Sequence, residues 1–392
     1  MSTIRVTNIE HGSTTDGGIQ LDNAGHVTVD SVQMPTAGAF SNRNLIINGA
    51  MNVAQRGTST TSTNAYGTVD RFKFVSSETN TQSQESLSTS DTPYSYGFRN
   101  YLRFKNTTAS SGSASTYREI DYRVEAQDIA SSGWDYTSTS SYITIQFWLR
   151  ASVSQSYYLH VRSQDGTQRS FVSELAVTAD TWKKFEIAMP GNSGITLDND
   201  TGLGLLVRFI PWYGTTYTGS GTLDAWTTSD NEVIPDMTDT WGETTNATFD
   251  ITGLQLEVGA KATPFEHRSY GDELVRCQRY CQTLGGDSYK QIAGAMRANT
   301  TTAKGALHLV TTMRAAPTGS TVGSGTFSFQ SGDSSLSGDV NFSALWTGGT
   351  DHNAVWIDWA PNSGTFGGSS KDYGMIYCNN GATRKLILSA EL

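Results

Sequence analysis

The clearest hydrophobic pattern in the chain runs from residue 249 to residue 285 and changes its period halfway. Apolar and polar residues alternate over 249–258, which is typical of a half-buried β-strand. Gly259 and Pro264 then interrupt the chain, and Asp272 and Glu273 open a segment with helical spacing that stops at Gly285. The pattern predicts a last strand, a Pro-containing corner and a connecting helix over 269–285.

Short β-type runs fill the chain on both sides of this helix. About nine runs between residues 71 and 258, separated by Gly, Ser, Asn or Asp clusters, are typical of a jelly-roll β-sandwich. Further short runs between 289 and 392 predict a second antiparallel sandwich. The sequence thus predicts an all-β protein with N-terminal attachment strands (1–43), a jelly roll (44–268), the connecting helix (269–285) and a C-terminal β-sandwich (286–392).

The segment before residue 44 holds only two alternating pieces, at 4–9 and 19–32, with Gly-rich turns between them. Such a segment buries little apolar area against the backbone entropy that ordering costs. We expect these strands to pair with copies of themselves or with another protein, which would make this the attachment end. The alternative is a flap on the chain's own jelly roll.

Two segments that bracket the predicted jelly roll resemble the domain boundaries of a known protein class. They are NRNLIINGAMNVAQRGTS at 42–59 and GLQLEVGAKATPFEHRSYGDELVRCQRYCQ at 253–282, and MRAAPTG at 313–319 and the closing ILSAEL agree with them. These segments resemble bacteriophage tail fibres that carry a carbohydrate-binding-module-like jelly roll and a distal β-sandwich. Cys281 departs from the resemblance, which would place a large aromatic there.

The resemblance implies a homotrimeric virion appendage, made in the host cytoplasm. Its N-terminus would attach to other tail or baseplate proteins, and its distal domain would bind host polysaccharide or lipopolysaccharide. One alternative is a purely structural tail or baseplate protein without receptor contact. A third reading is a glycan-degrading tailspike.

Composition and charge narrow the classes of partner. Only 16% of the 392 residues are charged, and a net charge of -10 without a Lys/Arg cluster argues against nucleic-acid binding. The N-terminus lacks the apolar run of a signal peptide, and 18 apolar residues never occur together, so we expect no membrane insertion. The three cysteines are expected to be reduced and buried.

Aromatic residues among small polar ones are the candidates for ligand binding. Sugar sites combine flat ring faces with hydroxyl and carboxylate partners, and the long segment 211–245 has this mixture. The C-terminal domain offers a second set near its turns. The candidates are Trp212, Tyr213, Trp226 and Trp241 in the long segment and Trp346 and Trp356 in the C-terminal domain. The alternative is that these rings prop the loop or pack against a neighbouring subunit.

No sequence motif indicates catalysis. The six histidines are scattered, and neither a metal motif nor a nucleophile motif occurs, so the sequence predicts no enzyme, no metal site and no cofactor. Glu119, Asp121 and Glu125 share one face of a predicted strand. Paired carboxylates are what a glycosidase needs, but we interpret this face as the ordinary solvent side of a half-buried strand.

Overall fold

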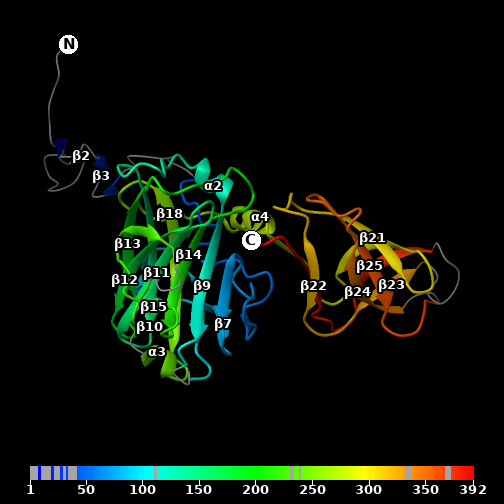
Figure 1. The fold of residues 1–392 in the computed structure, drawn as a ribbon. Helices are drawn as coiled ribbons and strands as arrows, with labels where there is room; N and C mark the ends of the chain where they lie inside the picture. The colour runs from blue at the N-terminus through cyan, green and yellow to red at the C-terminus, as the bar shows by residue number, and fades with distance from the viewer. Residues whose placement is uncertain are drawn as a thin grey trace, which may run out of the picture. The chain divides into compact units, whose positions relative to one another are not determined.

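A computed structural model describes residues 8–9, 19–21, 27–29, 32–33, 42–109, 113–229, 234–237, 240–331, 338–366 and 372–392. The chain forms two compact units (Figure 1). The first unit contains residues 1–52 and 58–268, and the second contains 53–57 and 269–392. The described secondary structure is almost entirely β, which confirms the all-β class.

The described N-terminal residues form a small antiparallel sheet of their own. Strands β1 (Asn8–Ile9), β2 (Ile19–Leu21), β3 (Val27–Val29) and β4 (Val32–Gln33) follow one another in the sheet in sequence order. Each of these strands pairs with the next strand of the same chain. Pairing of the segment with copies of itself or with another protein stays a prediction, and residues 4–7, 22–26 and 30–31 of the predicted pieces lie outside the described residues.

The first unit is a sandwich of two six-stranded antiparallel sheets. One sheet has the order β13-β10-β18-β8-β7-β5, and the other has the order β16-β12-β11-β14-β9-β6. The strands are β5 (Ser59–Thr60), β6 (Phe72–Ser76), β7 (Thr81–Ser86), β8 (Asn100–Lys105), β9 (Tyr117–Glu125), β10 (Tyr142–Ala151), β11 (Gln155–Ser163), β12 (Arg169–Val177), β13 (Lys183–Pro190), β14 (Leu203–Tyr213), β16 (Trp226–Thr228) and β18 (Thr248–Val258).

The strand β18 shows how the core of this unit forms. The apolar positions of its alternating pattern face the other sheet and are buried, as the pattern predicts. Gly253 interrupts the alternation: its φ of +65° lies in the left-handed region, and the pairing of β18 with β10 shifts register beside it. This bulge returns Leu254 to the phase of Ile251, so both enter the core.

The second face of β18 is also buried, which the two-residue period did not predict. Asp250 has no exposed surface and accepts hydrogen bonds from Arg103 at 2.8 Å and from Arg150 at 3.1 Å. Trp148 and Trp182 pack over the same sheet face, below α1 (Thr92–Ser95). Segments that cover the sheet turn a predicted half-buried strand into a strand buried on both sides.

The long segment 211–245 has regular structure in its described parts. Pro211, Trp212 and Tyr213 complete β14, and β16 adds an edge strand by pairing with β12. Strands β15 (Thr218–Gly219) and β17 (Ile234–Pro235) pair in parallel, and α3 (Thr240–Glu243) precedes β18. A short helix, α2 (Ala126–Ala130), follows β9 elsewhere in the unit.

The connecting helix α4 spans Tyr270–Gln278 and is shorter than predicted. Ser269 caps it, because its side chain accepts the Asp272 backbone N–H at 3.2 Å, and Asp272 and Glu273 occupy the first turn. Cys281 was predicted inside the helix but begins strand β19 (Cys281–Gly285). Its helical spacing from Cys277 is a coincidence of two neighbouring elements. All three cysteines are unbridged and buried, as predicted.

The second unit combines a three-stranded sheet with a closed barrel. The sheet has the order β19-β27-β22, and the barrel has the order β20-β21-β25-β24-β23-β26. Because β26 pairs with both β20 and β23, the predicted C-terminal sandwich closes and its barrel has no open edge. The strands are β20 (Gln291–Arg297), β21 (Ala303–His308), β22 (Thr318–Val322), β23 (Phe327–Ser331), β24 (Gly338–Leu345), β25 (Ala354–Pro361), β26 (Tyr373–Cys378) and β27 (Lys385–Ser389).

Candidate functional site

Two of the aromatic candidates, Trp212 and Trp241, lie in the core of the first unit and are removed from the ligand-binding set. They are 1% and 0% exposed. The Arg118 guanidinium lies 5.5 Å from the Trp212 ring and 5.9 Å from the Trp241 ring. The indole N–H of Trp241 donates to the Thr248 carbonyl at 2.9 Å. Neither ring has a face that a sugar could reach, because Trp212 enters the core at the end of β14, beyond a register shift, and α3 carries Trp241 inward.

Tyr213 and Trp226 are also held by neighbouring groups. The Tyr213 hydroxyl donates to the Glu119 carboxylate, and its ring packs 5.5 Å from that of Tyr217. Trp226 lies on the edge strand β16, where its indole N–H donates to the Pro190 carbonyl at 2.6 Å. Its ring packs edge-on against Phe171. The structure therefore gives both residues a packing role of the kind that the alternative interpretation of the loop described.

Trp346 and Trp356 are the candidates that the structure leaves exposed, at 45% and 42%. Trp346 directly follows β24 and Trp356 lies on the neighbouring β25, and the Trp346 backbone N–H donates to the Trp356 carbonyl at 2.9 Å. Their ring centroids are 5.2 Å apart and the planes are inclined by 50°. The turn after Trp346 contains Gly348 and Gly349, where a Cβ would come within 2.9 Å and 2.8 Å of the indole. Glycine at these two positions lets the backbone support the ring from below.

The register of the barrel extends this exposed pair into a longer surface. Asp358 follows Trp356 on the same face of β25 and pairs with Lys304 of β21. Lys304 pairs with Met296 of β20, which in turn pairs with Tyr373 of β26. Residues directly opposite one another in antiparallel strands share a face, so the row continues over four strands. We call the outward-facing set the aromatic belt; it comprises Trp346, Trp356, Asp358, Lys304, Met296, Tyr373 and Met375.

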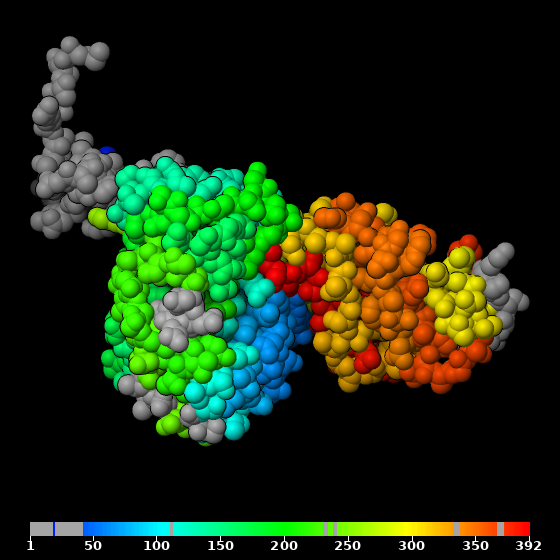
Figure 2. Space-filling view, in the orientation of Figure 1, coloured from blue at the N-terminus to red at the C-terminus, as the bar shows by residue number. Residues whose placement is uncertain are grey.

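The aromatic belt offers apolar and polar groups side by side. Tyr373 and Met375 are 74% and 42% exposed. From β25 to β26 the belt crosses three strand spacings, roughly 14 Å along the barrel surface. The Lys304 ammonium lies 5.8 Å from the Trp346 ring centroid and 3.9 Å from an Asp358 carboxylate oxygen. In Figure 2 the orange surface of the second unit belongs to the part of the chain that carries both tryptophans.

Sequence reasoning found the two tryptophans of the belt but not Lys304, Met296 or Met375. The outward face of β21 could have been predicted from the alternation of its residues, because Lys304, Ala306 and His308 all face outward. The pairing of β20 with both β21 and β26 was the missing information, because only it brings the side chains of four strands into one row.

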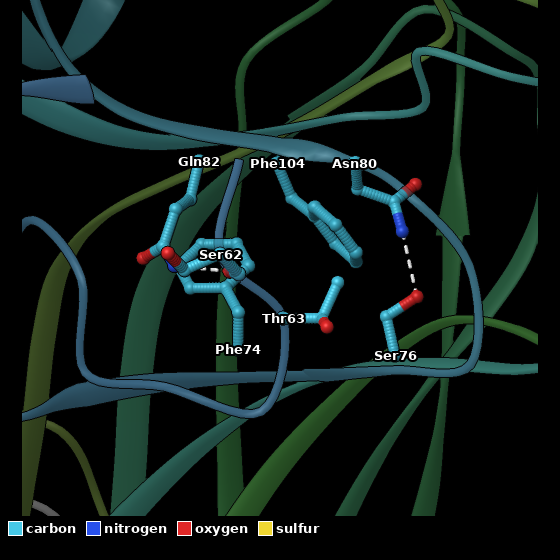
Figure 3. Close-up of a pocket in the computed structure, with 7 residues that line it drawn as sticks. All are labelled: Ser62, Thr63, Phe74, Ser76, Asn80, Gln82 and Phe104. Carbon is cyan, nitrogen blue, oxygen red and sulfur yellow. Dashed lines mark hydrogen bonds between the residues drawn. The ribbon is translucent and has the colours of Figure 1, made fainter. Parts of the chain in front are cut away.

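A small pocket in the first unit is too narrow to hold a saccharide. Figure 3 shows its walls, in which Phe74 and Phe104 face Ser62 and Thr63. Asn80 donates to the Ser76 hydroxyl at 2.6 Å and narrows one side. The walls leave no enclosed room even for a water molecule, whereas ligand pockets occupy roughly 300–1,000 Å³. This pocket is a gap near the sandwich edge, so an exposed surface is the better candidate for ligand binding.

The carboxylates of β9 form a charged cluster that the sequence misjudged. Glu119, Asp121 and Glu125 were expected on a solvent face, but they are 5%, 1% and 0% exposed. Arg208 of β14 binds Asp121 through two hydrogen bonds, of 2.8 Å and 3.2 Å, and lies 3.0 Å from Glu119. Burial, together with the neighbouring Asp121 charge, outweighs the attraction of Arg208 and raises the pKa of Glu119 to about 8.

This cluster is built for ion pairing within the sheet. Glu119 and Asp121 share the guanidinium of Arg208. Burial lowers the pKa of the neighbouring His160 well below its usual value. His160 is instead hydrogen-bonded to the Ser170 hydroxyl at 2.8 Å.

Among the residues that the structure describes, no group of three or more His, Cys, Asp or Glu side chains is arranged to hold a metal ion. In the same residues, no helix is long and apolar enough to cross a membrane.

Comparison with known proteins gives weak structural likenesses only. No protein-family model matches the chain, and no curated protein sequence matches it. Similar solved structures include the module TmCBM61 in complex with beta-1,4-galactotriose, at 12% identity and a TM-score of 0.27 over 55% of this chain and 98% of that chain. At these values the likenesses support no conclusion about fold or ligand.

Two further structures have comparable scores. A family 11 carbohydrate-binding module from Clostridium thermocellum, in complex with a beta-1,3-1,4-mixed-linked tetrasaccharide, is 14% identical with a TM-score of 0.25, covering 54% of this chain and 98% of that chain. A cyclase from Fischerella sp. is 9% identical with a TM-score of 0.31, covering 55% of this chain and 95% of that chain. One name refers to sugar binding and the other to catalysis, so the names do not agree on an activity.

Proposed function

We propose that this chain is a glycan-binding appendage of a bacteriophage virion and that the aromatic belt contacts host polysaccharide or lipopolysaccharide. The observation that carries the proposal is the exposed pair Trp346 and Trp356 beside Lys304 and Asp358. Indole faces cover the apolar C–H surface of a pyranose, and charged groups beside them bind its hydroxyls. The phage assignment rests on the segments at 42–59 and 253–282, which resemble tail-fibre sequences.

In this proposal the protein binds the glycan without cutting it. Glu119 and Asp121 are the paired carboxylates of the charged cluster, and both are buried against Arg208 inside a sheet face, where neither can reach a sugar ring. A glycosidase needs one carboxyl group to donate a proton to the leaving oxygen and another beside the sugar ring. Incubation with host capsule or lipopolysaccharide should leave the polymer length unchanged, and steady release of oligosaccharides would reverse this part of the proposal.

The experiment that tests the proposal is a glycan-array screen with the full chain, followed by affinity measurements on the polysaccharide found. The double variant Trp346→Ala/Trp356→Ala should lose at least tenfold in affinity. Tyr270→Ala is the matched control, because Tyr270 is a 59% exposed aromatic residue at the start of α4 and outside the belt. If the double variant binds like the control, the belt does not bind the glycan.

The exposed aromatic belt also favours a second candidate function, that of a structural virion protein. Contiguous exposed apolar surface marks protein contacts as well as ligand sites. In that case Trp356 and Tyr373 would pack against a neighbouring copy in a homotrimer. Sedimentation would then show the trimer of the full chain dissociating in Trp356→Ala, whereas glycan recognition predicts an unchanged assembly state.

The N-terminal strands are proposed to attach the protein to other tail or baseplate proteins. The described strands β1 to β4 are short and pair only with one another within the described residues. A chain that lacks residues 1–41 should fold and bind glycan normally but should no longer be incorporated into particles. Normal incorporation of the truncated chain would end this assignment.

A further inference from the structure

The outer face of the sheet that contains β9, β14 and β11 carries a positive cluster that the proposed function does not use. Arg123 pairs with Leu206, and Leu206 pairs with Arg162, so the two arginines flank one leucine on the same face. The adjacent row contains Asp121, Arg208 and His160 in the same order of strands. Leu206 is only 2% exposed, so its neighbours cover it.

The charges on this face do not balance. Lys73, which pairs with Asp121 across β6 and β9, joins Arg123, Arg162 and Arg208, so four cations meet the carboxylates Glu119 and Asp121. The third carboxylate of the charged cluster, Glu125, accepts a hydrogen bond from the Gln127 amide at 2.6 Å. Glu119 and Asp121 are both engaged by Arg208, and Asp121 also lies 3.8 Å from a nitrogen of Arg123. This local excess of positive charge occurs in a chain whose net charge is -10. Like charges held together in a partly buried face repel one another, which an anion between them would relieve.

The titration behaviour of these cations agrees with the imbalance. Burial, with Arg208 nearby, lowers the pKa of Arg162, and burial, with Arg123 nearby, lowers the pKa of Lys73. The environment of each group therefore disfavours its charged form. The raised pKa of Glu119 increases the excess of positive charge. When Glu119 is protonated and neutral, Asp121 is the carboxylate charge that remains beside the four cations.

Two buried donors on the edge of this face lack acceptors. Arg162 Nε and Gln164 Nε2 are buried and make no hydrogen bond to the residues that the structure describes. Arg162 lies on β11, which ends at Ser163, and Gln164 follows it with its backbone N–H donating to the Gly204 carbonyl at 2.9 Å. Buried polar donors are nearly always paired, so an external acceptor would satisfy these two.

We propose that this face binds the anionic group of an acidic saccharide, with Arg162 as its principal ligand and Arg123 and Lys73 completing a positive rim. The site lies in the first unit and is separate from the aromatic belt, so it goes beyond the proposed function. A guanidinium pairs with a carboxylate or a phosphate through two parallel hydrogen bonds. The unpaired Gln164 amide would donate to a hydroxyl of the same sugar. A single compact cluster of cations can pair with one anionic group on a sugar. A nucleic acid presents a continuous row of phosphates, and the net negative charge of the chain repels it.

The test uses the full chain and three acidic sugars, galacturonic acid, glucuronic acid and N-acetylneuraminic acid, each beside its neutral methyl ester. Calorimetry should show binding of at least one acid and not of its ester, with affinity falling as salt rises. Arg162→Gln should weaken binding at least tenfold. Lys184→Gln, which makes the same charge change on an exposed strand of the other sheet, should stay within twofold.

Several outcomes would overturn the proposal. They are equal binding of the methyl ester, equal loss in Lys184→Gln, no binding of any of the three acids, or binding of inorganic phosphate without any of them. A thermal unfolding curve for Arg162→Gln like that of the wild type shows that lost binding is not lost folding. The double variant Trp346→Ala/Trp356→Ala should bind the acidic sugar normally, so this site and the aromatic belt can fail separately.

Discussion

Replacing Trp356 by alanine tests whether the aromatic belt is a binding surface. A tryptophan presents roughly 250 Å², so the 42% of Trp356 that is exposed is about 100 Å². Covering half to all of that area at about 25 cal/mol per Å² is worth about 1.2 to 2.5 kcal/mol. Since about 1.4 kcal/mol is a tenfold change, Trp356→Ala should weaken glycan binding by about eightfold to seventyfold.

Trp359 provides the matched control, because it lies three residues further along β25 and points to the barrel interior with no exposed surface. Trp359→Ala should cost about 3 to 5 kcal/mol of stability. Trp356→Ala loses its contact with Trp346 at 5.2 Å, a loss of about 0.5 to 1.5 kcal/mol. Biolayer interferometry with the polysaccharide and chemical denaturation separate the two effects.

The reasoning would be refuted if Trp356→Ala kept its affinity at a concentration where it is fully folded. A loss of binding that merely followed the unfolded fraction would refute it as well, since Trp356 would then act like Trp359. A Trp346→Ala variant strengthens the measurement. If both rings stack on one ligand, the two losses should not add, because residues in contact share their interaction energy.

Three further predictions concern stability and assembly. Because burial raises the pKa of Glu119 from 4.5 to about 8, the folded chain binds a proton there that the unfolded chain releases. The free energy of unfolding should therefore fall between these pH values by up to about 1.4 kcal/mol per unit, and Glu119→Gln should remove that part of the slope in urea titrations. Gly253→Ala should lower stability by about 1 to 3 kcal/mol, because the φ of Gly253 is +65° and the added Cβ would come within 2.7 Å of the Phe98 ring. Gly271→Ala is the control: a Cβ at Gly271 would meet no side chain within 4 Å, so this variant should not be destabilised. Sedimentation at micromolar concentration should show a trimer, and a stable monomer would contradict that expectation.

Local periodicity was sufficient to predict much of the fold. The alternation over 249–258 placed Phe249, Ile251, Leu254 and Leu256 in the core, and each lies there. The start of the connecting helix was recognisable from Asp272 and Glu273, because first-turn carboxylates act within one turn, whereas the cap by Ser269 was found only in the structure. The end of the helix could not be recognised from the sequence, because Cys281 keeps helical spacing but pairs as a strand residue with Ser389, more than 100 residues later.

Burial of polar faces depended on partners that periodicity cannot identify. Asp121 looks exposed in the REIDYRVE pattern, and only its pairing with Arg208 of β14 explains why it can be 1% exposed. The same limit applied to the tryptophans. Trp241 and Trp356 were both candidates for ligand binding, yet α3 carries Trp241 inward while the alternation of β25 turns Trp356 outward.

Strand parity therefore decides which aromatic residues can meet a ligand. In β25 the buried residues Val355, Ile357 and Trp359 alternate with Trp356 and Asp358, so a polar residue two positions from a tryptophan marks the outer face. In β14 the phase is broken by a register shift between Phe209 and Trp212, and Trp212 enters the core despite following Pro211. A tryptophan on an uninterrupted strand can be assigned from its neighbours two residues away, whereas one beyond a bulge requires the paired strand.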